Sequence, residues 1–184
     1  MSEKQKAVDY KHAEVKSLLK NLSPKTSGGL ILLTGTNRSS KARFVDRFAK
    51  KLNRNVLLVD SRDLVSRDID KYRERMDQLV ESVRSDNSLL LFLNSDLFSG
   101  NYTNFTNSSV RYATPQSRYL ISLLKRTDRW VLMDVENEVN IDLTMKRFAD
   151  LQIQFGSSPS LFEKFRGGDE DYKGEMFPFK KNGM

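Results

Sequence analysis

The run Gly35-Thr36-Asn37-Arg38-Ser39-Ser40-Lys41-Ala42 has the length of a phosphate-binding loop and part of its composition. It follows an apolar stretch at residues 30–33 and precedes a helical pattern, which is where a loop of the form G-x-x-x-x-G-K-[ST] belongs. The first glycine and the lysine are present, whereas the second glycine is Ser40 and the hydroxyl residue is Ala42. The pattern therefore indicates a nucleotide-binding frame that lacks some of the groups that hold phosphate and magnesium.

Lys41 is the strongest remaining candidate for function in this loop. It can contact a phosphate or another anion at a helix N-terminus, with help from Arg38 and from the free amides of Gly35, Ser39 and Ser40. The alternative is a solvated lysine on a first helical turn. The chain has no cysteine and a single histidine, so we expect no metal site built from these ligands.

Hydrophobic periodicity predicts an α/β fold in which short apolar strands alternate with helices. Strands are expected at residues 30–33, 55–60, 89–93, 130–133 and 151–155, and helices at 5–21, 40–52, 68–85 and 115–126. Strands that are apolar along nearly their whole length are typical of a parallel sheet covered by helices on both faces. The sequence thus predicts a three-layer core with a five-stranded parallel sheet.

Three segments are expected along the 184 residues: an amphipathic helix at 1–24, the α/β core at 25–156, and an extended or partly disordered tail at 157–184. No apolar run approaches the ~20 residues that a membrane span needs, and the start lacks the apolar stretch of a secretory signal. We therefore expect a cytoplasmic protein without membrane contact. The net charge of +7 indicates an anionic partner, nucleic acid or an acidic protein surface, unless the mixed charges only form a solvated surface.

Several motifs between residues 28 and 156 resemble the AAA+ ATPase family and fall at the spacing of that family. They are Val59-Asp60-Ser61-Arg62-Asp63-Leu64-Val65-Ser66 at the exit of the second strand, Asp96-Leu97-Phe98-Ser99-Gly100, Arg111-Tyr112-Ala113, Tyr119-Leu120-Ile121, Val139-Asn140-Ile141-Asp142, and Arg147 followed by Asp150-Leu151-Gln152-Ile153-Gln154-Phe155. The resemblance implies a P-loop core of the AAA type.

The resemblance also implies that the groups for ATP hydrolysis are missing. Ala42 stands where a hydroxyl binds Mg²⁺, Leu93 and Asn94 stand at the two acidic Walker B positions, and Glu136 stands at the polar sensor position. A leucine cannot hold magnesium, an amide cannot act as a base near neutral pH, and the charge of Glu136 would repel a γ-phosphate. We therefore expect a pseudo-ATPase with no useful hydrolysis and no bound magnesium, in which ATP or ADP remains a possible ligand.

Two further departures from the family concern assembly. Asp68 stands where protein-threading relatives carry a pore aromatic, so we expect no threading of a polypeptide. The helical lid of the family needs on the order of 70 residues, more than follow Phe155, and we expect it to be absent. Arg147 occupies the position of an arginine that reaches into a neighbour's nucleotide site in family rings. It serves either as such a finger in trans or in a surface salt bridge.

Three functional hypotheses follow. The leading one is a non-catalytic AAA+-like scaffold or assembly factor that binds protein partners, such as a larger complex or an active AAA+ subunit. The tail motif around Tyr172 and Phe177 and the basic N-terminal helix would then dock into a partner, although both can also pack on their own core. The second hypothesis is a subunit whose ATP is structural or is hydrolysed with a partner's help. The third is a basic nucleic-acid-binding accessory protein.

Overall fold

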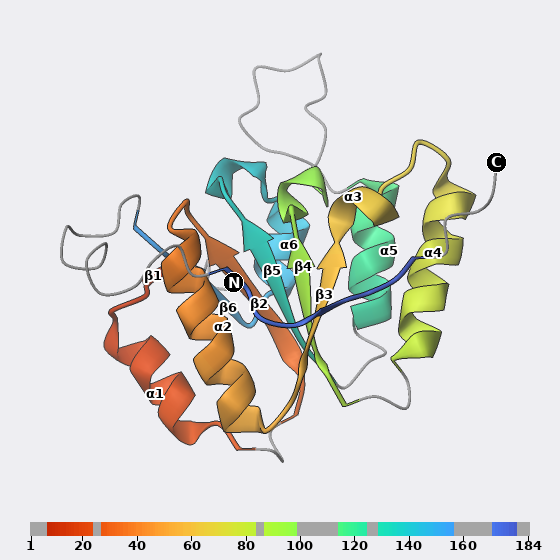
Figure 1. Cartoon of the computed structure of the whole chain (residues 1–184). Coiled ribbons are helices and arrows are strands. Elements are labelled where there is room, and N and C mark those ends of the chain that lie inside the picture. Colours follow the sequence, from red (N-terminus) through yellow and green to blue (C-terminus); the bar gives the residue numbers. More distant parts are fainter. Residues whose placement is uncertain are drawn as a thin grey trace, which may run out of the picture.

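The computed structural model describes residues 7–23, 27–83, 87–98, 114–124, 129–156 and 171–179 (Figure 1). The elements in chain order are β1 (Val8–Asp9), α1 (Ala13–Asn21), β2 (Gly29–Thr34), α2 (Arg38–Leu52), β3 (Val56–Asp60), α3 (Ser61–Leu64), α4 (Ile69–Ser82), β4 (Leu89–Leu93), η1 (Ser95–Phe98), α5 (Pro115–Leu124), β5 (Trp130–Val135), η2 (Glu138–Asn140), α6 (Leu143–Phe148), β6 (Leu151–Gln154) and β7 (Glu175–Met176).

A single open sheet, parallel throughout, forms the centre of the fold. Among the described residues it has seven strands in the order β1-β6-β2-β5-β4-β3-β7. The five strands predicted from the apolar runs are all present, but the predicted total of five is wrong because two short strands extend the sheet at its edges. Val8 pairs with Ile153 at one edge, and Leu58 pairs with Met176 at the other. Strands of two residues are too short to produce a periodic pattern in the sequence.

Helices cover both faces of the sheet, as the apolar strands predicted (Figure 1). Alternate side chains of β2 point to opposite faces: Ile31 and Leu33 belong to one hydrophobic core, and Leu30 and Leu32 to the other. The first core contains the buried side chains of α1 and α2, and the second contains those of α4, α5 and α6. The fold therefore has three layers with one core on each side of the sheet.

The helix boundaries differ from the predicted ones where a polar side chain caps the backbone. The predicted helix at 40–52 begins earlier, at Arg38, because the side chain of Asn37 accepts a hydrogen bond from the amide of Ser40. The predicted helix at 5–21 begins only at Ala13, where His12 is the capping residue. The helices at 68–85 and 115–126 become α4 and α5, and the predicted residues at 84–85 and 125–126 lie outside the described part.

Residues 171–179 pack against the chain's own core. In Figure 1 this blue segment runs in front of the sheet beside α2 and reaches the outer edge of β3. Tyr172 is 8% exposed and joins the core on the α2 face, together with Leu58 and Leu91. The amide of Phe177 donates a hydrogen bond of 2.8 Å to the carbonyl of Leu58. This part of the expected tail is therefore extended and ordered, and the rest of residues 157–184 lies outside the described residues.

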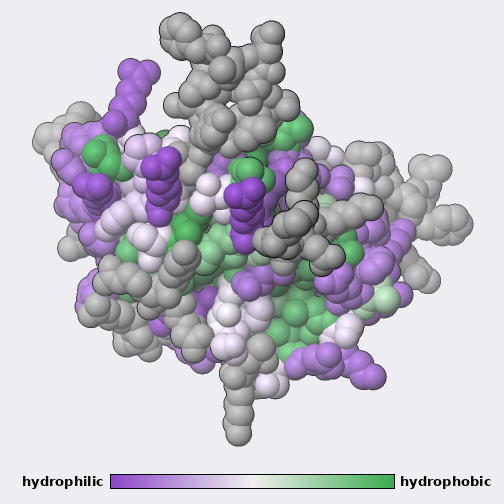
Figure 2. All heavy atoms as spheres, turned by 180° about the vertical axis from the view of Figure 1, so that it is seen from behind, coloured by the Kyte–Doolittle hydropathy of each residue, from purple (hydrophilic) through white to green (hydrophobic). Residues whose placement is uncertain are grey.

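The opposite side of the molecule is seen in Figure 2, where apolar areas stand among hydrophilic side chains. Three of the large apolar residues that remain exposed lie on η1, η2 and α6: Leu97, Val139 and Leu143. None of the helices among the described residues combines the length and apolar character that crossing a bilayer requires.

Replacing Tyr172 with alanine should lower the free energy of unfolding by about 3 kcal/mol, because it leaves a cavity between the returning segment and the sheet. Tyr172→Phe is the matched control: it keeps the ring and should cost less than about 1 kcal/mol. Urea unfolding measures both. A cost below about 0.5 kcal/mol for the alanine variant would show that residues 171–179 do not pack on the core in solution.

Candidate functional site

A cavity of about 510 Å³ opens at the carboxyl ends of the central strands. In open parallel sheets this edge is where ligands bind, because the loops leaving neighbouring strands meet there. The lining residues come from the last part of β5 and from the segments after β2, β3, β4 and β5: Gly35, Thr36, Arg38, Lys41, Arg62, Asn94, Asp96, Leu97, Asp134, Glu136, Asn137 and Asn140. The segment that the sequence analysis proposed as a phosphate-binding loop, residues 35–42, lies at this edge of the sheet.

Lys41 is buried in the floor of the cavity and pairs with a carboxylate. Its Nζ lies 2.5 Å from Oδ1 of Asp134 and donates a second hydrogen bond, of 3.0 Å, to the carbonyl of Val135. The side chains of Lys41 and Asp134 are 2% and 13% exposed. The interpretation of Lys41 as a solvated lysine is therefore wrong: α2 directs the ammonium inward, onto the end of β5.

The backbone between β2 and α2 does not form an open loop of free amides. Helix α2 already includes Arg38, Ser39 and Ser40, the residues that would belong to a phosphate-binding loop. The side chain of Asn37 accepts a hydrogen bond from the amide of Ser40, and the amide of Arg38 donates to the carbonyl of Thr36 at 2.9 Å. Capping by a side chain thus takes part of the place that an anion would occupy at this helix N-terminus.

Gly35 is required by the local backbone. It has a φ of +106°, and a Cβ at this position would lie 2.0 Å from the carbonyl oxygen of Phe155. Its amide donates a hydrogen bond of 3.1 Å to the carbonyl of Val135. The conformation and the close contact with the chain after β6 both favour glycine, whether or not a phosphate is bound.

The returning C-terminal segment supplies partners for Arg38. The Nε of Arg38 lies 2.8 Å from Oδ1 of Asp171, and its guanidinium lies over the ring of Tyr172 at 5.4 Å from the centroid. Burial raises the pKa of Tyr172 far above its ordinary value, and the charge of Asp134 adds to this rise. Tyr172 is therefore neutral under ordinary conditions and lies close to the Lys41–Asp134 pair.

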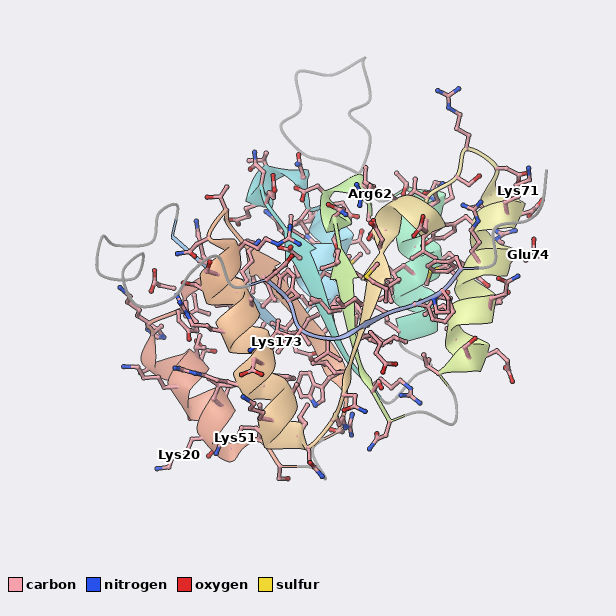
Figure 3. All side chains as sticks on the ribbon, viewed as in Figure 1. Lys20, Lys51, Arg62, Lys71, Glu74 and Lys173 are labelled. Carbon is pink, nitrogen blue, oxygen red and sulfur yellow. The ribbon has the colours of Figure 1, made fainter. Side chains whose placement is uncertain are left out.

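Asp60, at the end of β3, binds the side chains of Arg62 and Asn94, which both line the cavity. Arg62 is labelled in Figure 3, near the end of β3. Arg62 donates from Nε to both carboxylate oxygens and from Nη2 at 2.5 Å, and Asn94 Nδ2 donates at 3.0 Å. The hydrogen bond from Arg62 is the main reason that the pKa of Asp60 falls from 3.8 to about 2, against the opposing effect of burial. Asn94 adopts a φ of +54°, and its amide group is held on this carboxylate.

Asp96 holds together the two short helices that border the cavity. Its carboxylate accepts hydrogen bonds from the amides of Glu136 and Asn137 at 2.8 and 3.1 Å, and from Nδ2 of Asn140 at 2.8 Å. It therefore connects η1 to η2. The side chain of Glu136 is exposed and adds a negative charge at the cavity.

The structure brings together only some of the residues that the sequence selected. Gly35, Arg38, Lys41, Asn94 and Glu136 line the cavity, whereas Ser39, Ser40, Ala42 and Leu93 are not among its described lining residues. Ala42 is buried in the core beneath α2, and Leu93 packs against the same core. Arg147 is exposed on α6, away from this lining, and forms no ion pair with a described residue.

Sequence reasoning did not place Asp134, Asp60 or Tyr172 at this site, although Asp60 and Tyr172 belong to motifs that it named. A signal existed for the first two, since each follows an apolar run that ends at the carboxyl edge of a parallel sheet. Tyr172 had no such signal, because it reaches the site from a distant part of the chain. Within the described ranges no three His, Asp or Glu side chains stand together as metal ligands would.

A scan of protein-family models and a search of curated proteins both found no match for this chain.

The arrangement has the shape of a ligand site, but its charges are largely paired internally. Lys41 pairs with Asp134, Arg38 with Asp171 and Arg62 with Asp60. Of these three cations, Arg62 reaches furthest into solvent, with a side chain that is 70% exposed. An incoming anion must therefore compete with carboxylates that are already in place.

The ion pair of Lys41 should make a large contribution to stability. Lys41→Met should lower the free energy of unfolding by about 3–5 kcal/mol, because it leaves the carboxylate of Asp134 buried without its partner. The double variant Lys41→Met/Asp134→Leu should recover most of this loss. Urea unfolding of the three proteins measures the effect. A cost below about 0.5 kcal/mol for the single variant would mean that Lys41 is solvated.

Asp60 should make stability depend on pH in acid. Because the folded state lowers its pKa, Asp60 stabilises the fold above its ordinary pKa of 3.8, and this stabilisation is lost as the pH falls through about 2. Asp60→Asn keeps a residue able to cap α3 and should reduce the slope of unfolding free energy against pH in this range. Asp63→Asn, an exposed neighbour, is the matched control. An equal slope in wild type and Asp60→Asn would contradict the prediction.

Proposed function

We propose that this chain is a non-catalytic module with an AAA+-like frame that acts as a scaffold or assembly factor through protein–protein binding. The observation that carries the proposal is the buried ion pair between Lys41 and Asp134. The carboxylate of Asp134 supplies the negative charge that a phosphate would otherwise bring to this lysine. Since the two side chains are largely withdrawn from water, separating them without a replacement of equal quality costs several kcal/mol.

The surroundings of the pair support the same conclusion. Ala42 offers only a buried methyl group where a magnesium ligand would be needed, and Leu93 has no oxygen to donate. Asn94 binds Asp60 and has no basic group for activating water. Losing a single group that stabilises the transition state lowers rates by about 10²–10³, so the combined losses argue against hydrolysis.

A second candidate function is a subunit that binds ATP or ADP as a structural ligand or completes its site with a partner. The cavity itself favours it: about 510 Å³ is enough for a small ligand, and the exposed guanidinium of Arg62 stands at its edge. Arg147 would serve as the finger in trans in such an assembly. In this case the ligand has to displace Asp171 from Arg38 or bind beside that pair.

Calorimetric titration with ATP and ADP, with and without Mg²⁺, separates the two functions. The proposed scaffold should give no binding heat and no thermal stabilisation at millimolar nucleotide, whereas a ligand at 100 times its Kd would stabilise the fold by about 2.7 kcal/mol. Arg38→Glu is the control variant, since its side chain is exposed and lines the cavity. If the wild type binds nucleotide with a micromolar Kd and Arg38→Glu weakens this binding, the proposal of a scaffold that binds no nucleotide is contradicted.

A further inference from the structure

A basic groove lies between α1 and α2, on the outer surface of the molecule. It has a volume of about 560 Å³ and is lined by Lys16, Leu19, Lys20, Arg47, Lys50 and Lys51. We call this set of residues the α1–α2 groove. Figure 3 shows Lys20 and Lys51 close together on this side of the molecule. The groove lies along the second half of α2, whereas the cavity described above lies at its N-terminus.

The positive charge of the groove is mostly unbalanced. Its described lining contains five cationic side chains and no acidic one. Lys50 pairs with Asp46 at 2.8 Å, but none of the other four forms an ion pair with a residue in the described ranges. The groove therefore differs from the cavity at the sheet, where each of the three arginine and lysine side chains has its own carboxylate.

The cations form two rows with the same spacing. Lys16 and Lys20 stand one turn apart on α1, and Arg47 and Lys51 stand one turn apart on α2. Residues at i and i+4 on a helix have Cβ atoms about 5–6 Å apart. A ligand with acidic groups on both of its sides, repeated at the same interval, would match both rows. A helix with glutamates at i and i+4 on two sides has this arrangement.

The floor of the groove is apolar. Leu19 is half-buried and packs against the core beneath α1. The lysines beside it carry aliphatic stems, which can add apolar contact surface for a ligand. A nucleic-acid backbone offers a leucine only sugar C–H groups, and no aromatic ring lines the described groove for a base to stack on. An acidic peptide with an apolar stripe can satisfy both the walls and the floor.

We propose that the α1–α2 groove binds an acidic amphipathic helix of a partner protein. This inference rests on the proposed scaffold function and specifies its partner: the apolar stripe of the helix contacts Leu19, and its glutamates or aspartates pair with the two rows of cations. This is the helix-in-groove mode of recognition, in which apolar contact gives affinity and the flanking charges fix orientation and speed association.

A second cavity continues the basic surface beyond Lys50, a residue that it shares with the groove. It has a volume of about 640 Å³ and contains Arg54 and Lys173, together with the acidic Asp46 and Glu175. Nε and Nη1 of Arg54 are buried and have no hydrogen-bond partner among the described residues. Arg54 and Lys173 add positive charge at this end of the groove, beside Asp46 and Glu175.

The test uses fluorescence anisotropy with a labelled synthetic helix of about three turns, with glutamates at i and i+4 on both sides of a leucine stripe. The full chain should bind it, and added salt should weaken the binding. Lys20→Glu/Lys51→Glu, with one change in each wall, should weaken it about tenfold or more. Lys20→Gln/Lys51→Gln, a milder pair that removes both positive charges without adding negative ones, should weaken binding to a smaller extent. Replacing the leucines of the probe with serine should also weaken binding.

The control Arg67→Glu/Lys71→Glu changes the net charge equally on exposed residues before and in α4, and should leave binding within about twofold. Urea unfolding checks that all variants fold. Absent probe binding, or equal weakening by the control, would overturn the proposal. Binding of a DNA duplex that depends on Lys20 and Lys51, together with no binding of the peptide, would also overturn it. The nucleotide titration tests the cavity independently. A negative result with the peptide therefore leaves the proposal of a non-catalytic cavity unaffected.

Discussion

The ion pair between Lys41 and Asp134 is the interaction on which the carboxyl edge of the sheet depends. It joins the first turn of α2 to the end of β5 across the floor of the cavity, with Nζ and Oδ1 at 2.5 Å. Two charges withdrawn from water are tolerated only when each satisfies the other. The pair therefore helps to hold the first turn of α2 against β5, together with the buried apolar side chains of the helix, and gives the lysine an internal anion. The capping by Asn37, the buried methyl of Ala42 and the contact of Gly35 with Phe155 are all compatible with a helix held in this place.

The two ends of α2 differ in whether their positive side chains have carboxylate partners. Around its N-terminus, Arg38 binds Asp171, Lys41 binds Asp134, and the nearby Arg62 binds Asp60, so that the positive charges serve the fold. Along its second half, Arg47 and Lys51 face Lys16 and Lys20 without acidic neighbours in the lining. Charge that the fold does not use is available to a partner. This contrast supports the proposal that a partner binds at the α1–α2 groove and not at the cavity at the sheet.

The sequence was sufficient for the parts of the fold that are set by local pattern. Each predicted strand contains a run of apolar residues, and all five lie in a parallel sheet with a core on each face. Contacts between distant residues were not predictable in the same way. Asp134 is 93 residues from Lys41, and nothing in the sequence near either residue identifies the other as its partner. The edge strands β1 and β7 have two residues each and depend on neighbours that the pattern does not reveal. The start of α2 was missed because the Asn37 cap decides it, not hydrophobic periodicity.

The most direct test of the account is to observe the ammonium group of Lys41 by NMR while ATP and Mg²⁺ are added. The double variant Lys41→Met/Asp134→Leu, which should recover most of the stability lost in Lys41→Met, identifies the signal by the loss of one resonance. A buried ammonium that donates to Asp134 and Val135 should exchange slowly with water, and its resonance should stay in place at millimolar nucleotide. A resonance that exchanges rapidly with water and moves as nucleotide is added would contradict the account, because Lys41 would then be free to bind phosphate.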